Sequence, residues 1–251
     1  MQITGNTILI TGGNSGIGRA MAEALHKAGN QVIIAGRNQK SLDETVAANP
    51  GMNAVKFDVS AGEGIRAFAQ QVISDYPAVN VLINNAGIMK AENLLAQPED
   101  LADMEATIST NLLAPIRLIA AFLPHLQSKE AATIINVTSG LASVPLAATA
   151  TYNATKAAMH SYSQSLRFQL KDTTVQVIEW APPAVATELM PGHSANPQSM
   201  PLDEFIAESM DLLKNTPDAE EILVERVKFL RFAERSGQFD KVFNILNTTH
   251  P

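Results

Sequence analysis

The stretch from residue 7 to residue 29 most constrains the fold, because a short apolar run leads into a cluster of glycines and then into a helical pattern. Thr7–Thr11 (TILIT) is β-rich and does not alternate, which is typical of a strand buried on both faces of a parallel sheet. Four glycines follow between residues 12 and 18, and apolar residues then recur at helical spacing until Gly29. The stretch therefore predicts a strand, a glycine turn and a helix.

The glycine turn has a chemical meaning in this setting. Glycines let a backbone turn tightly and approach a ligand closely, while the N-terminus of the helix offers free N–H groups and a positive dipole end to a pyrophosphate. A glycine-rich segment can also be an ordinary tight turn. Because this one opens a strand-helix-strand unit, we favour a dinucleotide site.

The rest of the chain continues to alternate between apolar runs and helical patterns. The predicted strands are 31–35, 54–57, 79–83, 133–137 and 175–180, and the predicted helices are 62–74, 99–122 with a possible break near Pro115, 151–170, 203–214 and 219–235. This order and the length of 251 residues predict a single α/β domain over residues 1–251.

Tyr152 and Lys156 lie four residues apart in one predicted helix, so their side chains share a face. A fixed cation near a phenol favours the phenolate and lowers the tyrosine pKa from its usual value of about 10. The tyrosine could then exchange a proton near working pH. Taken alone, such a pair is usually just two neighbours on a helix surface, and other residues must decide.

Polar residues also stand at the carboxyl ends of predicted strands, the edge where open α/β sheets bind ligands. Arg37 follows the second strand, where a guanidinium suits the 2'-phosphate of NADP and an acidic residue would suit NAD. A solvated loop arginine is the alternative. Asp58 follows the third strand and either accepts a bond from an adenine amino group or caps a loop. Ser139 follows the fifth strand as a candidate site residue or a turn serine.

Two further amide-rich positions are ambiguous. The segment 84–87 (NNAG) offers small and amide residues against which a cofactor could lie, and it is equally typical of a turn. Asn111 lies inside a helical pattern, where a buried asparagine can bond a neighbouring carbonyl and bend the axis. Neither position decides a function without further motifs.

Composition limits the classes of partner. A net charge of -7 argues against nucleic acid or an anionic membrane surface as a partner. With no cysteine and with histidines scattered without metal-ligand spacing, we expect no metal site. The N-terminus lacks a basic region followed by a long apolar stretch, so we expect a soluble, cytoplasmic protein.

After the strand 175–180, a segment rich in Pro, Met and Ser reaches about Pro201. It reads as a mobile loop that could close over a substrate, with Leu189, Met190 and Met200 offering adaptable apolar contact. We place the substrate loop or lid at about 188–215. A plain surface excursion is the alternative.

Taken together, the motifs resemble those of the classical short-chain dehydrogenases/reductases over roughly residues 5–190. The TGxxxGxG turn spans 11–18, NNAG spans 84–87, the serine is Ser139, and YxxxK joins Tyr152 to Lys156. Asn111 matches the helix asparagine of that family. The shared order and spacing of these motifs is more specific than any one of them.

The resemblance implies a Rossmann-like, doubly wound parallel sheet with helices on both faces, and a hydride exchanged between NADP(H) and a carbonyl or secondary alcohol. Tyr152 would be the general acid/base, Lys156 would lower its pKa and hold the nicotinamide ribose, and Ser139 would bond the substrate oxygen. Asn111 would position a water in a proton relay. The implied cofactor residues are Gly12, Asn14, Ser15, Gly16, Ile17, Gly18, Arg37, Asp58, Val59, Asn85, Ala86, Gly87, Tyr152, Lys156 and Thr187.

The chain departs from the family pattern at two places. Pro182-Pro183 replaces the usual Pro-Gly, which removes a backbone N–H and stiffens the approach to Thr187. The C-terminal region is atypical and helical, and it lacks the usual final strand, so a tetramer is in doubt and a homodimer through helices 111–127 and 151–170 is favoured. Its tail faintly resembles that of bacterial relatives associated with teichoic acid D-alanylation.

Two other functions remain open at this point. The protein could be an NADP(H)-binding sensor or scaffold with a vestigial catalytic site, as Pro183 and the unusual C-terminal region would allow. Sugar epimerase or dehydratase chemistry fits poorly, because such relatives usually have a different glycine spacing and a larger substrate region. Leu141, Val144 and Leu146 indicate an apolar substrate pocket, although ordinary packing explains them too. They leave the substrate unnamed.

Overall fold

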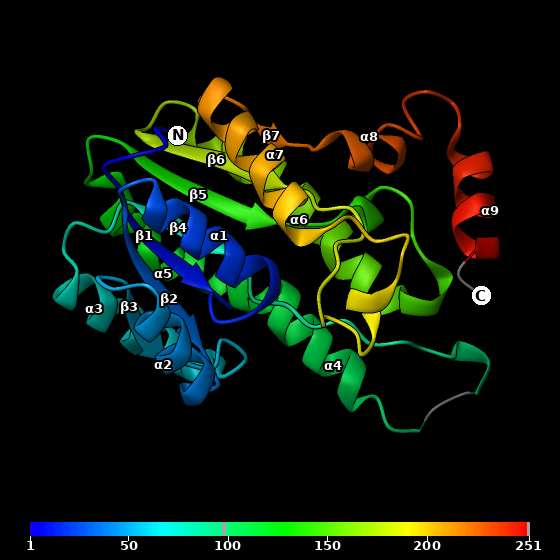
Figure 1. Ribbon diagram of the computed structural model, residues 1–251, viewed down its shortest axis with the longest axis horizontal. Coiled ribbons are helices and arrows are strands. Elements are labelled where there is room, and N and C mark those ends of the chain that lie inside the picture. The colour runs from blue at the N-terminus through cyan, green and yellow to red at the C-terminus, as the bar shows by residue number, and fades with distance from the viewer. Residues whose placement is uncertain (97–98, 250–251) are drawn as a thin grey trace.

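A seven-stranded, all-parallel sheet forms the middle of the computed structural model, which describes residues 1–96 and 99–249 (Figure 1). The strand order is β3-β2-β1-β4-β5-β6-β7. The strands are β1 (Thr7–Thr11), β2 (Gln31–Gly36), β3 (Asn53–Lys56), β4 (Val81–Asn84), β5 (Ala132–Val137), β6 (Val175–Trp180) and β7 (Glu221–Ile222). The order reverses direction between β1 and β4, and the crevice beyond the carboxyl ends of these strands is where such sheets bind ligands.

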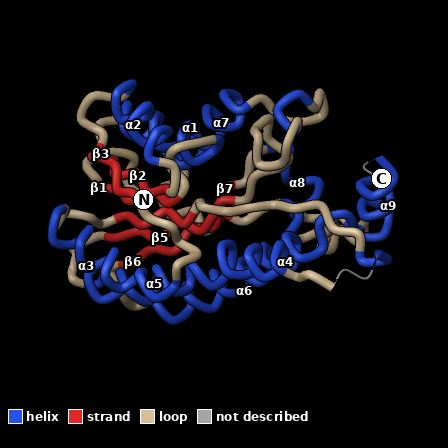
Figure 2. The backbone as a smooth tube through the Cα atoms, turned by 90° about the horizontal axis from the view of Figure 1, so that it is seen from below, coloured by secondary structure: helices blue, strands red, loops and turns tan. Residues whose placement is uncertain are grey.

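Helices cover both faces of the sheet, as Figure 2 shows. One layer holds α1 (Gly16–Lys27), α2 (Gln39–Ala48) and α7 (Leu202–Asn215); the other holds α3 (Ile65–Asp75), α4 (Ala102–Ile108), α5 (Ala114–Gln127) and α6 (Ala150–Leu170). Two shorter helices, α8 (Glu225–Arg231) and α9 (Phe239–Thr249), extend beyond the sheet. The doubly wound fold and its atypical helical C-terminal region are therefore as predicted.

The burial of β1 explains why a continuous apolar run predicted this strand correctly. Ile8 and Ile10 point into the core beneath α1 and α7, whereas Leu9 points into the core beneath α3, α5 and α6. All three side chains have no exposed surface. A strand that is covered on both faces has no solvent side on which polar residues could alternate.

The long apolar helix is continuous, but a π-helical segment at Ser109–Leu113 joins α4 to α5. The possible break near Pro115 does not occur, because Pro115 lies just after the π-helical segment, where the regular helical hydrogen bonding is already altered. Among the described residues, Ala102–Gln127 is the stretch long and apolar enough to cross a membrane. Here one face of it packs in the core, with Leu118, Ile119 and Phe122 buried against the sheet.

Three expectations for the C-terminal third need correction. The segment 219–235 is not one helix but β7 followed by α8, and β7 supplies the final strand that we expected to be absent. β7 pairs in parallel with β6 through Glu179↔Glu221 and Trp180↔Ile222, so its strand form comes from its neighbour. Residues 202–215 are not part of a loop either, since α7 packs into the core through Phe205. Only the first part of the expected lid is irregular.

Candidate active site

A pocket of about 420 Å³ opens at the carboxyl ends of the central strands. Its lining comes from the glycine turn after β1, the loop after β4, the end of β5, helix α6, the loop after β6, and helices α8 and α9. Predicted site residues that line it are Gly12, Ser15, Gly16, Ile17, Gly18, Asn85, Ala86, Gly87, Ser139, Tyr152, Lys156 and Thr187. Residues far apart in the sequence are thus brought to one place.

The glycine turn and the NNAG loop form one hydrogen-bonded unit. The Thr11 hydroxyl accepts bonds from the backbone N–H groups of Asn85 (3.1 Å) and Ala86 (3.2 Å). The Asn85 amide in turn donates to the carbonyls of Thr11 (2.9 Å) and Gly12 (3.2 Å). A Cβ on Gly12 would lie 2.9 Å from the Ala86 Cα, and one on Gly18 would lie 2.2 Å from the Asn85 amide nitrogen. These glycines are needed because the two loops touch.

The N-terminus of α1 faces this pocket. Gly16, Ile17 and Gly18 line it, and Ser15 at the N-cap makes no side-chain capping bond. The first N–H groups of a helix lack partners within the helix and attract anions. Thr187 comes from the loop after β6 and lies 3.6 Å from the position of a Cβ on Gly16. The glycine turn is therefore bordered by two other loops, those after β4 and β6.

Four predicted cofactor residues lie outside the pocket lining, near the ends of β2 and β3. The Asn14 amide donates to the Ser41 hydroxyl at 2.5 Å. Arg37 is exposed, with one guanidinium nitrogen 3.8 Å from an Asp58 oxygen. The other Asp58 oxygen accepts bonds from the Ser60 N–H and hydroxyl, as a loop-capping aspartate does. Val59 is buried and borders a separate small hollow.

Tyr152 and Lys156 lie one turn apart on α6, with the lysine ammonium 5.5 Å from the centre of the phenol ring. The ammonium donates to the Val137 carbonyl at 2.8 Å, which ties α6 to the end of β5. Ser139 follows that strand and hydrogen-bonds the Tyr152 side chain. Both α6 residues are buried. Serine, tyrosine and lysine therefore meet as the sequence predicted.

Glu92 holds the start of α6 in place. Its carboxylate accepts bonds from the Thr151 N–H (2.7 Å) and hydroxyl (2.8 Å), and its own N–H donates to Ala148 (2.8 Å). An anion at a helix N-terminus is stabilised by the free N–H groups there. Glu92 belongs to the loop after β4, so this loop and the helix that carries Tyr152 are joined one residue before the tyrosine.

Burial controls the protonation of both site residues. It raises the pKa of Tyr152 to about 12, although the Ser139 hydrogen bond opposes the rise. It lowers the pKa of Lys156 to about 8. We expected Lys156 to lower the pKa of Tyr152, but that pKa is raised, because burial removes the phenolate from water. Tyr152 is therefore protonated at neutral pH.

Asn111 lies in the π-helical segment and does not line the pocket. Its side-chain oxygen accepts a hydrogen bond from the Ile88 N–H at 2.9 Å, and its side-chain NH2 group donates to the Ile88 backbone carbonyl at 2.8 Å. A Cβ on Gly87 would lie 3.4 Å from the Asn111 oxygen and 3.8 Å from the Lys156 nitrogen. Asn111 and Lys156 thus both border Gly87, and the Asn111 amide is held by backbone.

This geometry agrees with the comparison to known families. The family described as short chain dehydrogenase matches residues 6–198, about three quarters of the chain. The chain belongs to the short-chain dehydrogenase/reductase family. Members of this family are oxidoreductases, and both the glycine turn and the Ser-Tyr-Lys set lie within the matched residues.

Individual short-chain dehydrogenases/reductases cover almost the whole chain. The uncharacterized oxidoreductase DltE of Bacillus subtilis (strain 168) is 42% identical over 253 residues, covering 99% of each sequence. A short chain dehydrogenase from Burkholderia cenocepacia J2315, solved in complex with NADP, has a TM-score of 0.81 at 26% identity and covers 96% and 99% of the two chains. A 3-ketoacyl-(acyl-carrier-protein) reductase from Brucella melitensis, solved with NADH, has a TM-score of 0.76 at 25% identity and covers 86% and 93%.

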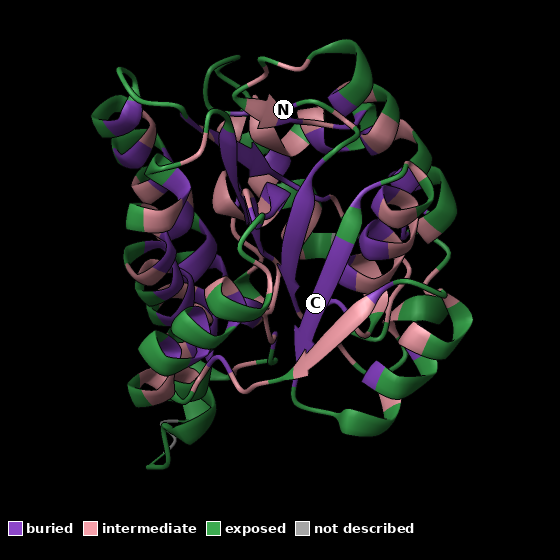
Figure 3. Ribbon diagram, turned by 90° about the vertical axis from the view of Figure 1, so that its left-hand side faces the viewer, coloured by how far each residue is buried: buried purple, intermediate pink, exposed green. Residues whose placement is uncertain are grey.

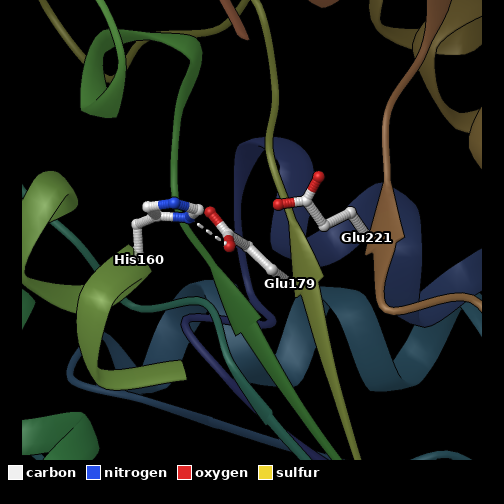
Figure 4. Close-up of side chains that lie close together, drawn as sticks. All are labelled: His160, Glu179 and Glu221. Atoms are coloured by element: carbon white, nitrogen blue, oxygen red, sulfur yellow. Dashed lines mark hydrogen bonds and ion pairs between the residues drawn. The ribbon is translucent and has the colours of Figure 1, made fainter. Parts of the chain in front are cut away.

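In this short-chain dehydrogenase/reductase, a polar cluster that the sequence did not reveal surrounds Glu179 (Figure 4). Glu179 on β6 is 1% exposed and accepts bonds from the Thr138 hydroxyl (2.7 Å) and from His160 Nδ1 (2.6 Å). Burial raises the pKa of Glu179, but these bonds outweigh it and hold the pKa below the usual range. Glu179 therefore joins β5, β6 and α6 as a carboxylate.

The same cluster has the composition of a metal site. Ligand atoms of His160, Glu179 and Glu221 lie within 4.8 Å of one another. Arg231 already contacts Glu221 at 2.6 Å, and both Glu179 oxygens already accept protein hydrogen bonds. A cation would have to displace these partners, so we assign the cluster a structural role.

The far side of the pocket contains residues that the sequence analysis did not single out. Leu230 on α8 and Leu246 on α9 line it together with Leu141 and Leu146. Val144 was also predicted to line the pocket, but its side chain is fully buried in a small apolar cluster outside the lining. Met200 is likewise 6% exposed in the main core, because a β-bridge between Val185 and Met200 closes the loop at its base.

Proposed function

We propose that this chain transfers a hydride between NADP(H) and a carbonyl or secondary alcohol, with Tyr152 as the general acid/base. One observation carries the proposal: the side chains of Ser139, Tyr152 and Lys156 meet in a pocket whose other side is the glycine turn and the N-terminus of α1. A proton-transferring group thus lies beside a surface suited to a dinucleotide.

The residues fit a nicotinamide dinucleotide. The backbone at Gly12 and Gly18 leaves no room for a Cβ, and the Ser15 cap leaves helix N–H groups available to a pyrophosphate. A bound nicotinamide would supply or accept the hydride. Arg37 supports NADP over NAD, because its exposed guanidinium can pair with a 2'-phosphate and no acidic residue directly follows β2.

The site residues then divide the work. In carbonyl reduction, Tyr152 is protonated at neutral pH and can donate its proton to the substrate oxygen. Ser139 can hydrogen-bond the same oxygen and hold it beside the phenol. Lys156 places a cation near the phenolate that forms, and its charge acts more strongly in a buried site than in water. Oxidation of an alcohol runs through the same contacts in reverse.

The decisive test is Tyr152→Phe, with Tyr162→Phe as its matched control on the same helix. We expect Tyr152→Phe to lower kcat by about 100- to 10,000-fold, because general acid/base catalysis contributes that much. The NADPH dissociation constant should change little, and Tyr162→Phe should leave kcat intact, since Tyr162 packs in the core. The measurement is NADPH absorbance with a panel of ketones, aldehydes and secondary alcohols.

Two results would count against the proposal. Undiminished turnover by Tyr152→Phe would remove the tyrosine from the mechanism. Tight NADPH binding without Tyr152-dependent turnover of any panel member would instead favour a cofactor-binding sensor.

A further inference from the structure

The outer wall of the pocket is built by the C-terminal helices. A Cβ on Gly140, the residue after Ser139, would lie 2.8 Å from Leu230 Cδ1 and 2.9 Å from Val227 Cγ2. The missing side chain at residue 140 therefore lets α8 approach the Ser139 turn directly. This contact brings Leu230 into the pocket lining next to the catalytic residues.

Helix α9 is fixed against the same region. The side-chain oxygen of Asn247 accepts from the Ala147 N–H at 2.6 Å, and its amide donates to the Pro145 carbonyl at 3.1 Å. These bonds join α9 to the segment just before α6. A small apolar cluster of Val144, Ala233 and Val242, with Leu230 and Leu246 packed against it, fills the space behind the wall. The position of Leu246 in the lining is thus held by the fold.

The pocket lining is mostly apolar and contains few charged side chains. Among the described residues that line the pocket, the basic side chains are Lys156 and His193, and the acidic one is Glu188. Lys156 is bonded to the Val137 carbonyl beside the phenol. The Glu188 carboxylate accepts bonds from the Gly192 N–H and the Ser194 hydroxyl, and His193 lies close enough to lower its pKa.

This charge distribution disfavours an anionic substrate. A carboxylate or phosphate next to Leu141, Leu230 and Leu246 would lose water without gaining a cationic partner from these side chains. An uncharged hydrocarbon portion would instead gain from the removal of apolar surface from water. We propose that the substrate is an uncharged, largely apolar ketone, aldehyde or secondary alcohol whose hydrocarbon part packs against Leu141, Leu230 and Leu246. This proposal rests on the proposed oxidoreductase function.

The test uses two methyl ketones of equal chain length, 2-octanone and the anionic 7-oxooctanoate. We expect the full-length enzyme to favour 2-octanone by at least about 100-fold in kcat/KM with NADPH, consistent with the cost of an unpaired charge. Calorimetric binding to NADPH-loaded Tyr152→Phe should show the same preference without turnover. Equal or better binding of 7-oxooctanoate, or binding of neither ketone, would overturn the proposal.

A second comparison assigns the preference to the wall. Leu246→Arg should reduce the preference for 2-octanone by at least about tenfold, because the new guanidinium can pair with the carboxylate. Ile245→Arg is the matched control, since Ile245 is exposed on the same helix and outside the pocket lining. Equal changes in both variants would contradict the assignment. If 2-octanone binds selectively but is not reduced, the wall proposal stands and the proposed oxidoreductase function fails.

Discussion

The two ends of the pocket are built in different ways. The glycine-turn end consists mainly of backbone from β1, α1 and the loop after β4, joined by hydrogen bonds through Thr11 and Asn85. The outer end consists of mostly apolar side chains from α8, α9 and the loop after β6. Figure 1 shows α9 beyond the sheet. Backbone recognises a ligand through groups that every residue has, whereas side chains select by shape and polarity. The first end therefore suits a shared cofactor and the second a particular substrate.

The largest effect should come from adding a side chain where the glycine turn touches the NNAG loop. Gly12→Ala adds a Cβ 2.9 Å from the Ala86 Cα, and its φ of +66° already disfavours a side chain. Gly5→Ala shares the positive φ, +78°, but its Cβ would meet nothing within 4 Å. We expect about 1–2 kcal/mol of destabilisation from strain in both variants. Overpacking should add about 1–3 kcal/mol in Gly12→Ala alone.

Gly12→Ala should also weaken NADPH binding by about 100-fold or more, while Gly5→Ala should not. Thermal denaturation and NADPH fluorescence titration measure the two quantities. Equal losses of stability and of NADPH affinity in both variants would show that the close approach of the two loops is unimportant.

A smaller effect should follow from substitution of Glu179, whose carboxylate faces His160 in Figure 4. Glu179→Gln weakens the buried bonds to Thr138 and His160, and we expect a loss of about 1–3 kcal/mol in the free energy of unfolding at pH 7. Glu220→Gln is the control, because Glu220 is a largely exposed partner of Arg167 and should contribute less than about 1 kcal/mol. Urea denaturation at several pH values measures both.

The sign of the pH dependence follows from the lowered pKa of Glu179. Its ionised form stabilises the fold above the ordinary carboxyl pKa of 4.5, and this contribution is lost as the pH falls through the lower folded-state pKa. The stability difference between wild type and Glu179→Gln should therefore shrink in acid. A difference that stays constant from pH 7 to pH 3 would show that the carboxylate charge plays no part.

The smallest effect should come at the rim of the backbone end. Arg37→Gln should raise the NADPH dissociation constant about tenfold, or about 1.4 kcal/mol, through the loss of a charged partner for the 2'-phosphate. NADH binding should stay unchanged. Lys40→Gln removes a nearby exposed cation and serves as the control. Fluorescence titration measures the binding of both cofactors. If Arg37→Gln weakens NADPH binding and NADH binding equally, Arg37 does not bind the 2'-phosphate.

The fold was largely predictable because its strands are buried on both sides. The runs at Thr7–Thr11 and Val175–Trp180 have the predicted limits, and the other long strands differ by one or two residues. The two-residue strand β7 was missed because its strand form depends on pairing with β6, which leaves almost no periodic signal. The π-helical segment at Ser109–Leu113 was missed as well, since helical spacing does not report a single widened turn.

The candidate site was predictable where a short motif carries the geometry, and not elsewhere. The spacing from Tyr152 to Lys156 places both side chains together, but it contains no measure of burial, which reverses the expected direction of the tyrosine pKa. The outer wall depends on contacts such as the bond between Ala147 and Asn247, which are 100 residues apart. No local pattern reports a contact of that kind.

The third apolar cluster decides which parts of the chain must be exchanged together between relatives. Val144, Ala233 and Val242 pack separately from the two cores on either side of the sheet. Figure 3 shows buried strands in the middle of the molecule between layers of helices. A chimaera that exchanges residues 225–249 must also match residue 144, which lies outside them, and the main core, to which Val227 on α8 belongs.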